Sequence, residues 1–459
     1  MSFDLVIRGA VVVGAGVGAP SRVDVGVADG LIAALGAELS GPATEEVDAD
    51  GLYLLPGVVD GHVHMNEPGR TAWEGFDTGT RALAAGGATA AIDMPLNAHP
   101  PTVTGAAFDE KRRCLELRAF VDVALWGGLV PDGIDAMHEL AARGVVGFKA
   151  FMCSSGIDDF PGVDDLTLYE GMCRAASLGL PVAVHAESEA ITAGLAQRAR
   201  AAGRTAMRDF LASRPVVAEL EAVARAITLA EESGCSLHVV HVSTGRGVAL
   251  VAAARARGVD VSCETCPHYL VLTDEDAEVL GNVAKCAPPL RPREESEALW
   301  QALADGTLPM VASDHSPAPG ALKSGDDAFA AWGGISGCQT MLPLLLSEGT
   351  GARGLSLELI AAATSGYVAR RFRLPGKGRV EPGADADFAL VALGASASEE
   401  LSAMDLHYRH RHSPFVGRRF AARVVRTFAR GRTVFADGRI VGRPAGRLLI
   451  PTTTEMESR

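Results

Sequence analysis

Both ends of the chain carry short runs in which apolar and polar residues alternate. Within residues 1–55 these runs include DLVIRGAVVV and RVDVGVADGLIAAL, separated by turns that contain Gly or Pro. The same alternation returns near the other end in ADADFALVAL and RTFARGRTVFA. Such alternation is typical of antiparallel strands with one buried face. Because neither end is long enough to bury a good core alone, we expect both to share a single β-sandwich.

The middle of the chain follows a different pattern. Short apolar runs such as LPVAVHAE, CSLHVVHVS and LPMVASDH alternate with longer segments of helical spacing, for example 216–233 and 247–257. Repeated strand–helix units over about 300 residues predict a parallel sheet with helices outside, and a (β/α)₈ barrel is the commonest single domain of that length. A doubly wound open sheet is the alternative, but no GxGxxG follows a first strand to support it.

These changes of pattern divide the chain into four segments. Residues 1–55 and 376–445 are predicted to be the two parts of the β-sandwich, and residues 56–375 the barrel. Residues 446–459 follow as a tail, whose end PTTTEMESR we expect to be loosely ordered. The predicted fold class is therefore α/β, with a small second domain built from both ends of the chain.

Composition narrows the possible partners and the cellular setting. The net charge of −14 argues against nucleic acid and against anionic membrane surfaces, because either would require a basic face. The N-terminal residues lack the pattern of a signal peptide, and no apolar stretch approaches the roughly 20 residues of a membrane span. With eight scattered cysteines, this indicates a cytoplasmic protein with reduced thiols. Cys263 and Cys266 form a lone CxxC motif, which we interpret as ordinary thiols.

Residues that can bind metals end the apolar runs in the middle of the chain. In a barrel, the carboxyl ends of all strands converge on one face. Positions i and i+2 of a strand point to the same side, so that His62 and His64 can hold one ion together. Nitrogen and oxygen donors gathered in this way predict a metal site. The run-ending residues are His62, His64, Lys149, His185, His241 and Asp314.

Each of these residues also has a simpler interpretation when taken alone. A single His at a strand end is more often a hydrogen-bonded structural residue, Asp314 could cap the turn SDHSP, and Lys149 could reach solvent. The occurrence of all six at strand ends favours the metal hypothesis. His238 lies three residues before His241 and is expected to face the opposite side, while His268 and His315 are expected to support the site.

Lys149 is an unusual candidate ligand. A protonated ammonium would be repelled by two dications, and a neutral amine could bind only one of them. If CO₂ carboxylates the amine, the resulting carbamate is anionic and its two oxygens can bridge two ions. We therefore expect Lys149 to be carboxylated.

Motifs along residues 2–445 point to a known family. HVHMNEPGR, WEGF, GFKAFM, HAES, HVSTGRG, CETCPHYL, KCAPPLR and SDHSP together resemble the cyclic amidohydrolases of the amidohydrolase superfamily. This group includes dihydroorotases, dihydropyrimidinases, hydantoinases and allantoinases, and the motifs are most similar to those of allantoinases. The resemblance implies a barrel with a β-sandwich, a small-molecule substrate and a homo-oligomer, often a tetramer.

The resemblance also implies a binuclear metal centre. One ion would be held by His62, His64 and Asp314, and the other by His185 and His241, with carboxylated Lys149 and a hydroxide as bridges. Zinc is the default for such donors, but iron, manganese or cobalt would fit the same site.

The implied reaction is hydrolysis of the ring amide of allantoin to allantoate, in purine catabolism. The bridging hydroxide would attack, and Asp314 would carry the proton to the departing ring nitrogen. Dihydroorotases have an arginine at the position of Asn66, where it suits a substrate carboxylate, so we expect a neutral substrate. Asn66 could instead be a turn residue without substrate contact. Asn97, Ser316 and Gly333 are further candidates for substrate binding, whereas Arg291 is expected to pair at the surface.

Two other functions remain open. Hydantoinases and dihydropyrimidinases typically place a tyrosine soon after the bridging lysine, whereas this chain has Phe151 there and no tyrosine before Tyr169. A non-catalytic scaffold is the alternative from a different class. It is disfavoured because all six ligand positions are filled.

Overall fold

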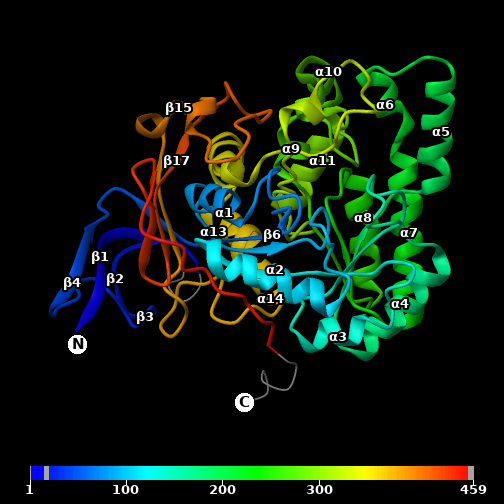
Figure 1. The fold of residues 1–459 in the computed structure, drawn as a ribbon. Coiled ribbons are helices and arrows are strands. Elements are labelled where there is room, and N and C mark those ends of the chain that lie inside the picture. The colour runs from blue at the N-terminus through cyan, green and yellow to red at the C-terminus, as the bar shows by residue number, and fades with distance from the viewer. Residues whose placement is uncertain (1, 15–19, 453–459) are drawn as a thin grey trace.

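A computed structural model describes residues 2–14 and 20–452 of the chain. The ribbon has two regions, which lie side by side in Figure 1. A β domain on the left holds the first strands together with strands from the end of the chain, and a helix-covered barrel lies on the right.

The β domain contains one sheet of nine strands drawn from both ends of the chain. Its order is β19–β18–β17–β14–β5–β1–β2–β3, with β4 paired to β1. The two ends meet where β14 runs antiparallel to β5, with Phe388 opposite Pro56. One domain from both ends is therefore confirmed. The strands are β1 (Phe3–Val12), β2 (Ser21–Ala28), β3 (Leu31–Gly36), β4 (Ala43–Asp48), β5 (Tyr53–Pro56), β14 (Phe388–Leu393), β17 (Ala422–Ala429), β18 (Arg432–Ala436) and β19 (Arg439–Ile440).

The barrel is built from parallel strands in two sheets. β6–β7–β8 form one sheet and β9–β10–β11–β12–β13 the other, and only Trp126 separates β8 from β9 along the chain. The ring closes through residues 311–315, because Val311 bridges Thr265 and His315 bridges Val63, both in parallel. The predicted barrel is therefore confirmed. Its strands are β6 (Val58–Val63), β7 (Ala88–Asp93), β8 (Asp122–Leu125), β9 (Gly127–Gly128), β10 (Phe148–Phe151), β11 (Val182–His185), β12 (Leu237–Val239) and β13 (Val261–Cys263).

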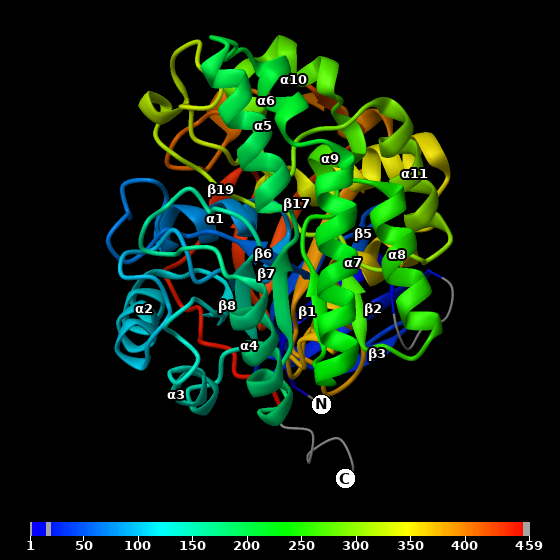
Figure 2. The ribbon, with the colours of Figure 1, turned by 90° about the vertical axis from the view of Figure 1, so that its right-hand side faces the viewer.

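Helices cover the outside of the barrel, and Figure 2 shows α4, α7 and α8 in front of the strands. The helices that lie along the chain between β6 and β13 are α1 (Phe76–Ala85), α2 (Gly105–Arg118), α3 (Met137–Ala142), α4 (Asp165–Ser177), α5 (Glu189–Ala201), α6 (Met207–Ser213), α7 (Val216–Ser233) and α8 (Gly245–Ala256). The later ones are α9 (Pro267–Val271), α10 (Asp274–Leu280), α11 (Arg293–Ala304), α12 (Met341–Leu344), α13 (Leu357–Ala361) and α14 (Tyr367–Arg371), and β15 (Glu399–Glu400) pairs with β16 (Arg419–Phe420).

Helix α7 illustrates how local sequence sets these boundaries. It spans the predicted range 216–233, begins after Pro215 and ends at Gly234, whose φ of 67° is in the left-handed region. Glycine adopts this conformation without strain, so it is a common residue just past a helix end. Alanines spaced four apart, from Ala218 to Ala230, form its buried face. Small side chains at that spacing let the helix pack closely on the strands.

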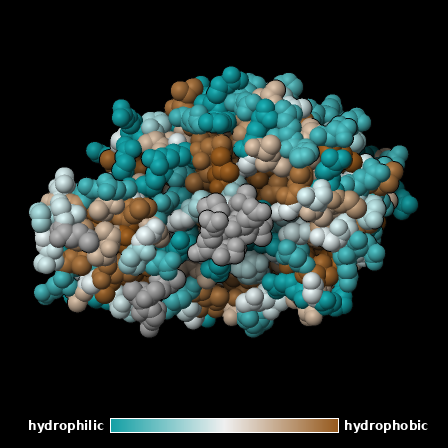
Figure 3. Space-filling model, turned by 90° about the horizontal axis from the view of Figure 1, so that it is seen from below, coloured by the Kyte–Doolittle hydropathy of each residue, from teal (hydrophilic) through white to brown (hydrophobic). Residues whose placement is uncertain are grey.

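The end of the described chain returns to the barrel. Gly446 donates to the carbonyl of Ala119 at 2.8 Å and Leu449 donates to that of Val123 at 2.9 Å. The rest of the predicted tail, residues 453–459, lies outside the described residues. Seen from below, hydrophilic residues surround small hydrophobic patches on the surface (Figure 3). No helix within the two described ranges is long and apolar enough to cross a bilayer.

Candidate metal centre and active site

The first three predicted ligands meet at one point of the barrel rim. Nε2 of His62 lies 3.2 Å and Nε2 of His64 lies 3.3 Å from Oδ1 of Asp314. Nδ1 of His64 donates to the carbonyl of Leu96 at 3.0 Å, which leaves the lone pair of Nε2 facing the carboxylate. All three side chains are buried and close enough to hold one ion.

His185 and His241 form a second pair beside the first. Nδ1 of His185 lies 3.1 Å from Nε2 of His241, and the ring of His241 lies 5.5 Å from that of His62, measured between centroids. Burial lowers the pKa of both residues, and that of His241 falls further because His185 and Lys149 are close. Neutral imidazoles with ring nitrogens turned to one point suit a divalent cation.

Lys149, on β10, is the sixth predicted ligand and its amine has no hydrogen-bond partner. The side chain is fully buried, and its Nζ is one of the unpartnered polar atoms of the described chain. Burial lowers the pKa of Lys149 to about 7, although Asp314 and Glu264 oppose this shift. A substantial fraction of neutral amine near pH 7 is what carboxylation by CO₂ requires. The donors present therefore fit divalent cations, and a carbamate at Lys149 stays a prediction.

Glu264 orients two histidines and was missed at the sequence level. Its Oε1 lies 2.6 Å from Nδ1 of His62 and its Oε2 lies 3.1 Å from Nε2 of His238. Burial alone raises the pKa of Glu264, but His62 and His238 outweigh it and lower the pKa to about 2. The carboxylate thus fixes the His62 tautomer whose Nε2 faces the metal centre. The missed signal was the position of Glu264, which directly follows the end of β13, as the ligand His185 ends β11.

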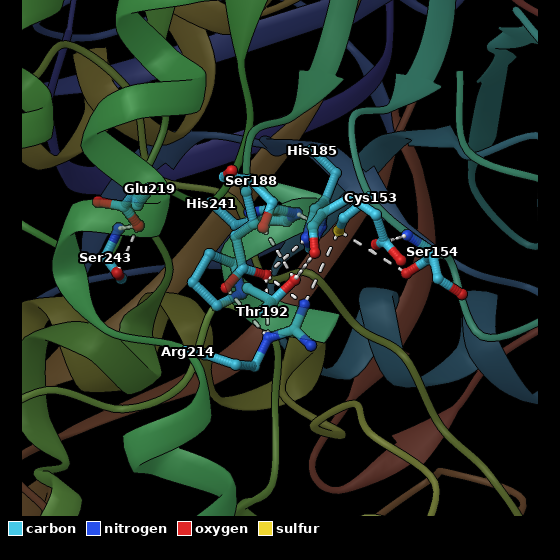
Figure 4. A network of polar contacts seen from close by, with 12 residues as sticks. Cys153, Ser154, His185, Ser188, Thr192, Arg214, Glu219, His241 and Ser243 are labelled. Atoms are coloured by element: carbon cyan, nitrogen blue, oxygen red, sulfur yellow. Dashed lines mark hydrogen bonds and ion pairs between the residues drawn. The ribbon is translucent and has the colours of Figure 1, made fainter. Parts of the chain in front are cut away.

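Glu187 orients His185 in the same way as Glu264 orients His62. Its Oε2 lies 2.8 Å from Nε2 of His185 and accepts a hydrogen bond from Nη2 of Arg214 at 2.6 Å. The ring of Phe151 stacks on His185 at 4.6 Å, so that Nδ1 points to His241. Figure 4 shows Arg214 and Cys153 beside His185. Cys153, His185 and Glu187 also lie within metal-binding distance of one another, but the guanidinium of Arg214 between them disfavours a cation there.

A cavity of about 770 Å³ opens above these six side chains. Three of the four residues expected to bind substrate line it, namely Asn97, Ser316 and Gly333. Asn66 is not among the described lining residues. Its Nδ2 donates to the carbonyl of Pro317 at 3.2 Å, and its φ is 60°. This placement matches the alternative of a turn residue, and its contact with substrate stays a prediction.

The structure also places two further histidines and one arginine that were singled out in the sequence. His238 contacts Ser262 and Glu264 inside the barrel, and Nδ1 of His315 accepts a hydrogen bond from the backbone of Gly337 at 3.3 Å. The expectation that Arg291 pairs at the surface was wrong. Arg291 is buried, and it donates to Oγ of Ser243 at 3.0 Å and to the carbonyl of Arg214 at 2.6 Å. Tertiary packing supplies these acceptors, and none of them is adjacent to Arg291 in sequence.

Comparison with known proteins agrees with the motifs. The profile described as "Amidohydrolase family" matches residues 53–434. The chain belongs to the amidohydrolase family. A relative from Rubrobacter xylanophilus named "Allantoinase" is 62% identical over 450 residues, which cover 98% of each chain. A second "Allantoinase", from Solibacter usitatus, is 54% identical and covers 98% of this chain and 97% of its own.

Solved structures resemble this amidohydrolase over its whole length. L-hydantoinase (dihydropyrimidinase) from Arthrobacter aurescens superposes with a TM-score of 0.94 and 35% identity, and covers 98% of this chain and 100% of its own. Dihydropyrimidinase from Brevibacillus agri gives a TM-score of 0.90 and 31% identity, with 98% of each chain covered. The resemblance seen in the sequence is therefore confirmed, and the amidohydrolase is a hydrolase with a candidate metal centre.

Proposed function

We propose that this amidohydrolase opens the hydantoin ring of allantoin to give allantoate. The observation that carries the proposal is the identity of 44–62% to relatives named "Allantoinase" over nearly the whole chain. The residues at the barrel rim support it, because they supply donors for metal ions and a buried carboxylate below a cavity large enough for a small cyclic amide.

The donor set supports our proposal that the candidate ligands hold two divalent ions. His62, His64 and Asp314 would hold one ion, His185 and His241 the other, and carboxylated Lys149 would lie between them. Zinc is the default, and iron, manganese or cobalt would suit the same donors. When bound, such ions supply an activated water and polarise the scissile carbonyl.

Asp314 is the proposed proton carrier. Burial by itself raises its pKa, but the surrounding imidazoles of His62, His64 and His241 hold the pKa well below its usual range. The group is therefore ionised, and we propose its carboxylate as the acceptor for a proton of the attacking water. As oxygen adds to the carbonyl carbon and the C–N bond breaks, Asp314 returns that proton to the departing ring nitrogen. One water is consumed, and the products are a carboxylate and a terminal ureido group.

Residues of the cavity wall would orient the ring. Asn97 and Ser316 offer a side-chain amide and a hydroxyl, and Gly333 offers its backbone, which together suit the amide donors and acceptors of a neutral hydantoin. Arg70 holds Asn97 in place, because its Nη1 donates to the carbonyl of Asn97 at 2.8 Å.

Hydantoinase activity is the second candidate, because the superposed structures carry that name. Turnover of allantoin, 5-substituted hydantoins, dihydrouracil and dihydroorotate by the metal-loaded protein separates the candidates. We expect the highest kcat/KM with allantoin, and a preference for dihydroorotate would overturn the neutral-substrate argument. A protein that binds no metal when supplied with zinc and bicarbonate would instead be a scaffold.

We also propose a cellular compartment and an oligomeric state for this protein. Eight free thiols in the described chain suit a reducing cytoplasm. The family resemblance suggests a homotetramer, which the mass of the native particle in solution would test.

A further inference from the structure

One wall of the cavity combines two phenylalanines with three cations. The rings of Phe210 and Phe329 meet edge to face, with centroids 5.8 Å apart, and both line the cavity. Nζ of Lys285 lies 4.6 Å from the Phe210 ring, and the guanidinium of Arg200 lies 5.1 Å from that of Phe329. Arg214 approaches Phe210 at 5.8 Å. All three cations also line the cavity.

Only one of these cations has a carboxylate partner within ion-pair distance in the described chain. Arg214 pairs with Glu187 at 2.6 Å. Nζ of Lys285 donates to the carbonyl of Ala331, an uncharged acceptor, although the residue is buried. Arg200 has its contact with Phe329 and no ion pair among the described residues. In a chain of net charge −14, a buried lysine without a counter-charge beside an exposed arginine on one cavity wall suits a ligand that supplies a negative charge.

The electrostatic state of Lys285 agrees with this geometry. Burial lowers the pKa of Lys285 to about 8, and Arg214 and Arg200 add to the shift. Asp327 opposes it from a distance, but its carboxylate accepts hydrogen bonds from the backbone of Phe329 at 2.8 Å and of Ala330 at 3.2 Å. A nearby anion would therefore stabilise the charged form of Lys285 more than its present neighbours do.

We propose that Lys285 and Arg200 form a carboxylate subsite that receives the ring-opened product as it leaves the metal centre. The inference rests on the proposed function, because hydrolysis of a neutral cyclic amide creates one carboxylate. The substrate carries no such charge, so the subsite distinguishes product from substrate. It draws the acid along the wall towards the mouth of the cavity, where Arg200 is exposed on α5.

Calorimetric titration of the metal-loaded full-length protein tests the subsite. The probes are allantoate, its uncharged primary amide, and bicarbonate as a free oxyanion. The variants are Lys285→Met and Arg200→Met, with Lys285→Arg to restore the charge. Arg198→Met is the matched control, because Arg198 is exposed on the same helix and does not line the cavity. Lys323→Met controls for loop anchoring, since Lys323 donates to the carbonyl of Gly334 at 2.5 Å.

We expect each of the two variants to weaken allantoate binding about tenfold and amide binding less than about twofold, as removal of one charged contact predicts. The inhibition constant of allantoate should rise in parallel, while Lys285→Arg and Arg198→Met stay near the unmodified protein. Equal weakening of acid and amide would overturn the proposal, as would unchanged allantoate binding in Lys285→Met. Bicarbonate binding tighter than allantoate with the same Lys285 dependence would overturn the assignment to product.

Failure of the subsite and failure of the proposed function give different results. A protein that does not open allantoin but binds allantoate through Lys285 would keep the subsite and lose the function. A protein that opens allantoin while Lys285→Met binds allantoate normally would keep the function and lose the subsite. Thermal unfolding of every variant shows whether the fold is intact.

Discussion

Two buried lysines in this molecule have opposite surroundings. Nζ of Lys377 lies 2.7 Å from a carboxylate oxygen of each of Asp122, Asp385 and Asp387. Nζ of Lys149 has no hydrogen-bond partner at all. Burial lowers the pKa of Lys149 to about 7. It acts in the same direction on Lys377, but there the three carboxylates outweigh it and raise the pKa above its usual value.

The difference shows how one residue type serves structure or chemistry. Lys377 is a fixed charge that joins Asp122 of β8, in the barrel, to the segment before β14, in the β domain. No carboxylate pairs with the amine of Lys149 in the described chain, so its pKa is low and the neutral amine can react with CO₂. Burial is the same in both places, and the neighbouring carboxylates decide the outcome.

The largest expected effect is on catalysis. Lys149→Ala removes the proposed bridge between two ions, so we expect kcat to fall by at least about a thousandfold, as is common when a metal bridge is lost. A short carboxylic acid such as acetate should restore part of the activity by occupying the vacated space. Steady-state kinetics with metal analysis provides the measurement. Full activity in Lys149→Ala would remove the carbamate from the mechanism.

The matching change at the other lysine should affect stability instead. Lys377→Met leaves Asp385 and Asp387 without this cation and Asp122 with Arg430 alone, which we expect to destabilise the fold by about 3–5 kcal/mol. The denaturant midpoint of Lys377→Met, compared with that of Lys149→Met, measures this loss of stability. Equal loss of stability in the two variants would mean that the carboxylates around Lys377 do not distinguish the two sites. The double variant Lys377→Met with Asp385→Asn should regain part of the lost stability.

A smaller effect is expected from the carboxylates that orient the predicted histidine ligands, because neither of them is itself a predicted ligand. Glu264→Gln and Glu187→Gln should each weaken metal binding about 10- to 100-fold, the usual effect of losing such a partner. Competition with a chelator measures this. Glu219→Gln is the control, because Glu219 is equally buried but bonds Ser243 and Thr244 and no predicted ligand. Comparable loss in the control would point to general damage.

The smallest effect is a pH dependence of the stability difference between the unmodified protein and Lys377→Met. Burial alone raises the pKa of Asp122, but Lys377 and Arg430 outweigh it and lower the pKa below 3.8. A depressed carboxyl pKa contributes stability above the unfolded value, and this contribution is lost as pH falls through the folded value. The difference should therefore be largest near pH 7 and shrink below about pH 4. A difference independent of pH would show that charge is not its source.

The candidate metal centre could be found in the sequence because its signals are local. A histidine, lysine or aspartate at the end of an apolar run is recognisable from spacing, and parallel strands place such ends on one face. The helical spacing of residues 216–233 likewise predicted the bounds of α7, and Pro215 and Gly234 flank the helix in the structure. Glu264 carried the same strand-end signal and was overlooked.

Only the tertiary structure decided which groups neutralise or orient one another. His62 and Glu264 are 202 positions apart, and Lys377 and Asp122 are 255 apart, so no local pattern links them. For the same reason, the burial of Arg291 could not be predicted, and the sequence left open whether Asn66 contacts substrate or is only a turn residue. The sequence by itself determined which donors stand at the strand ends. The fold decided where counter-charges lie, because electrostatic energy depends on distance in space and on burial, not on distance along the chain.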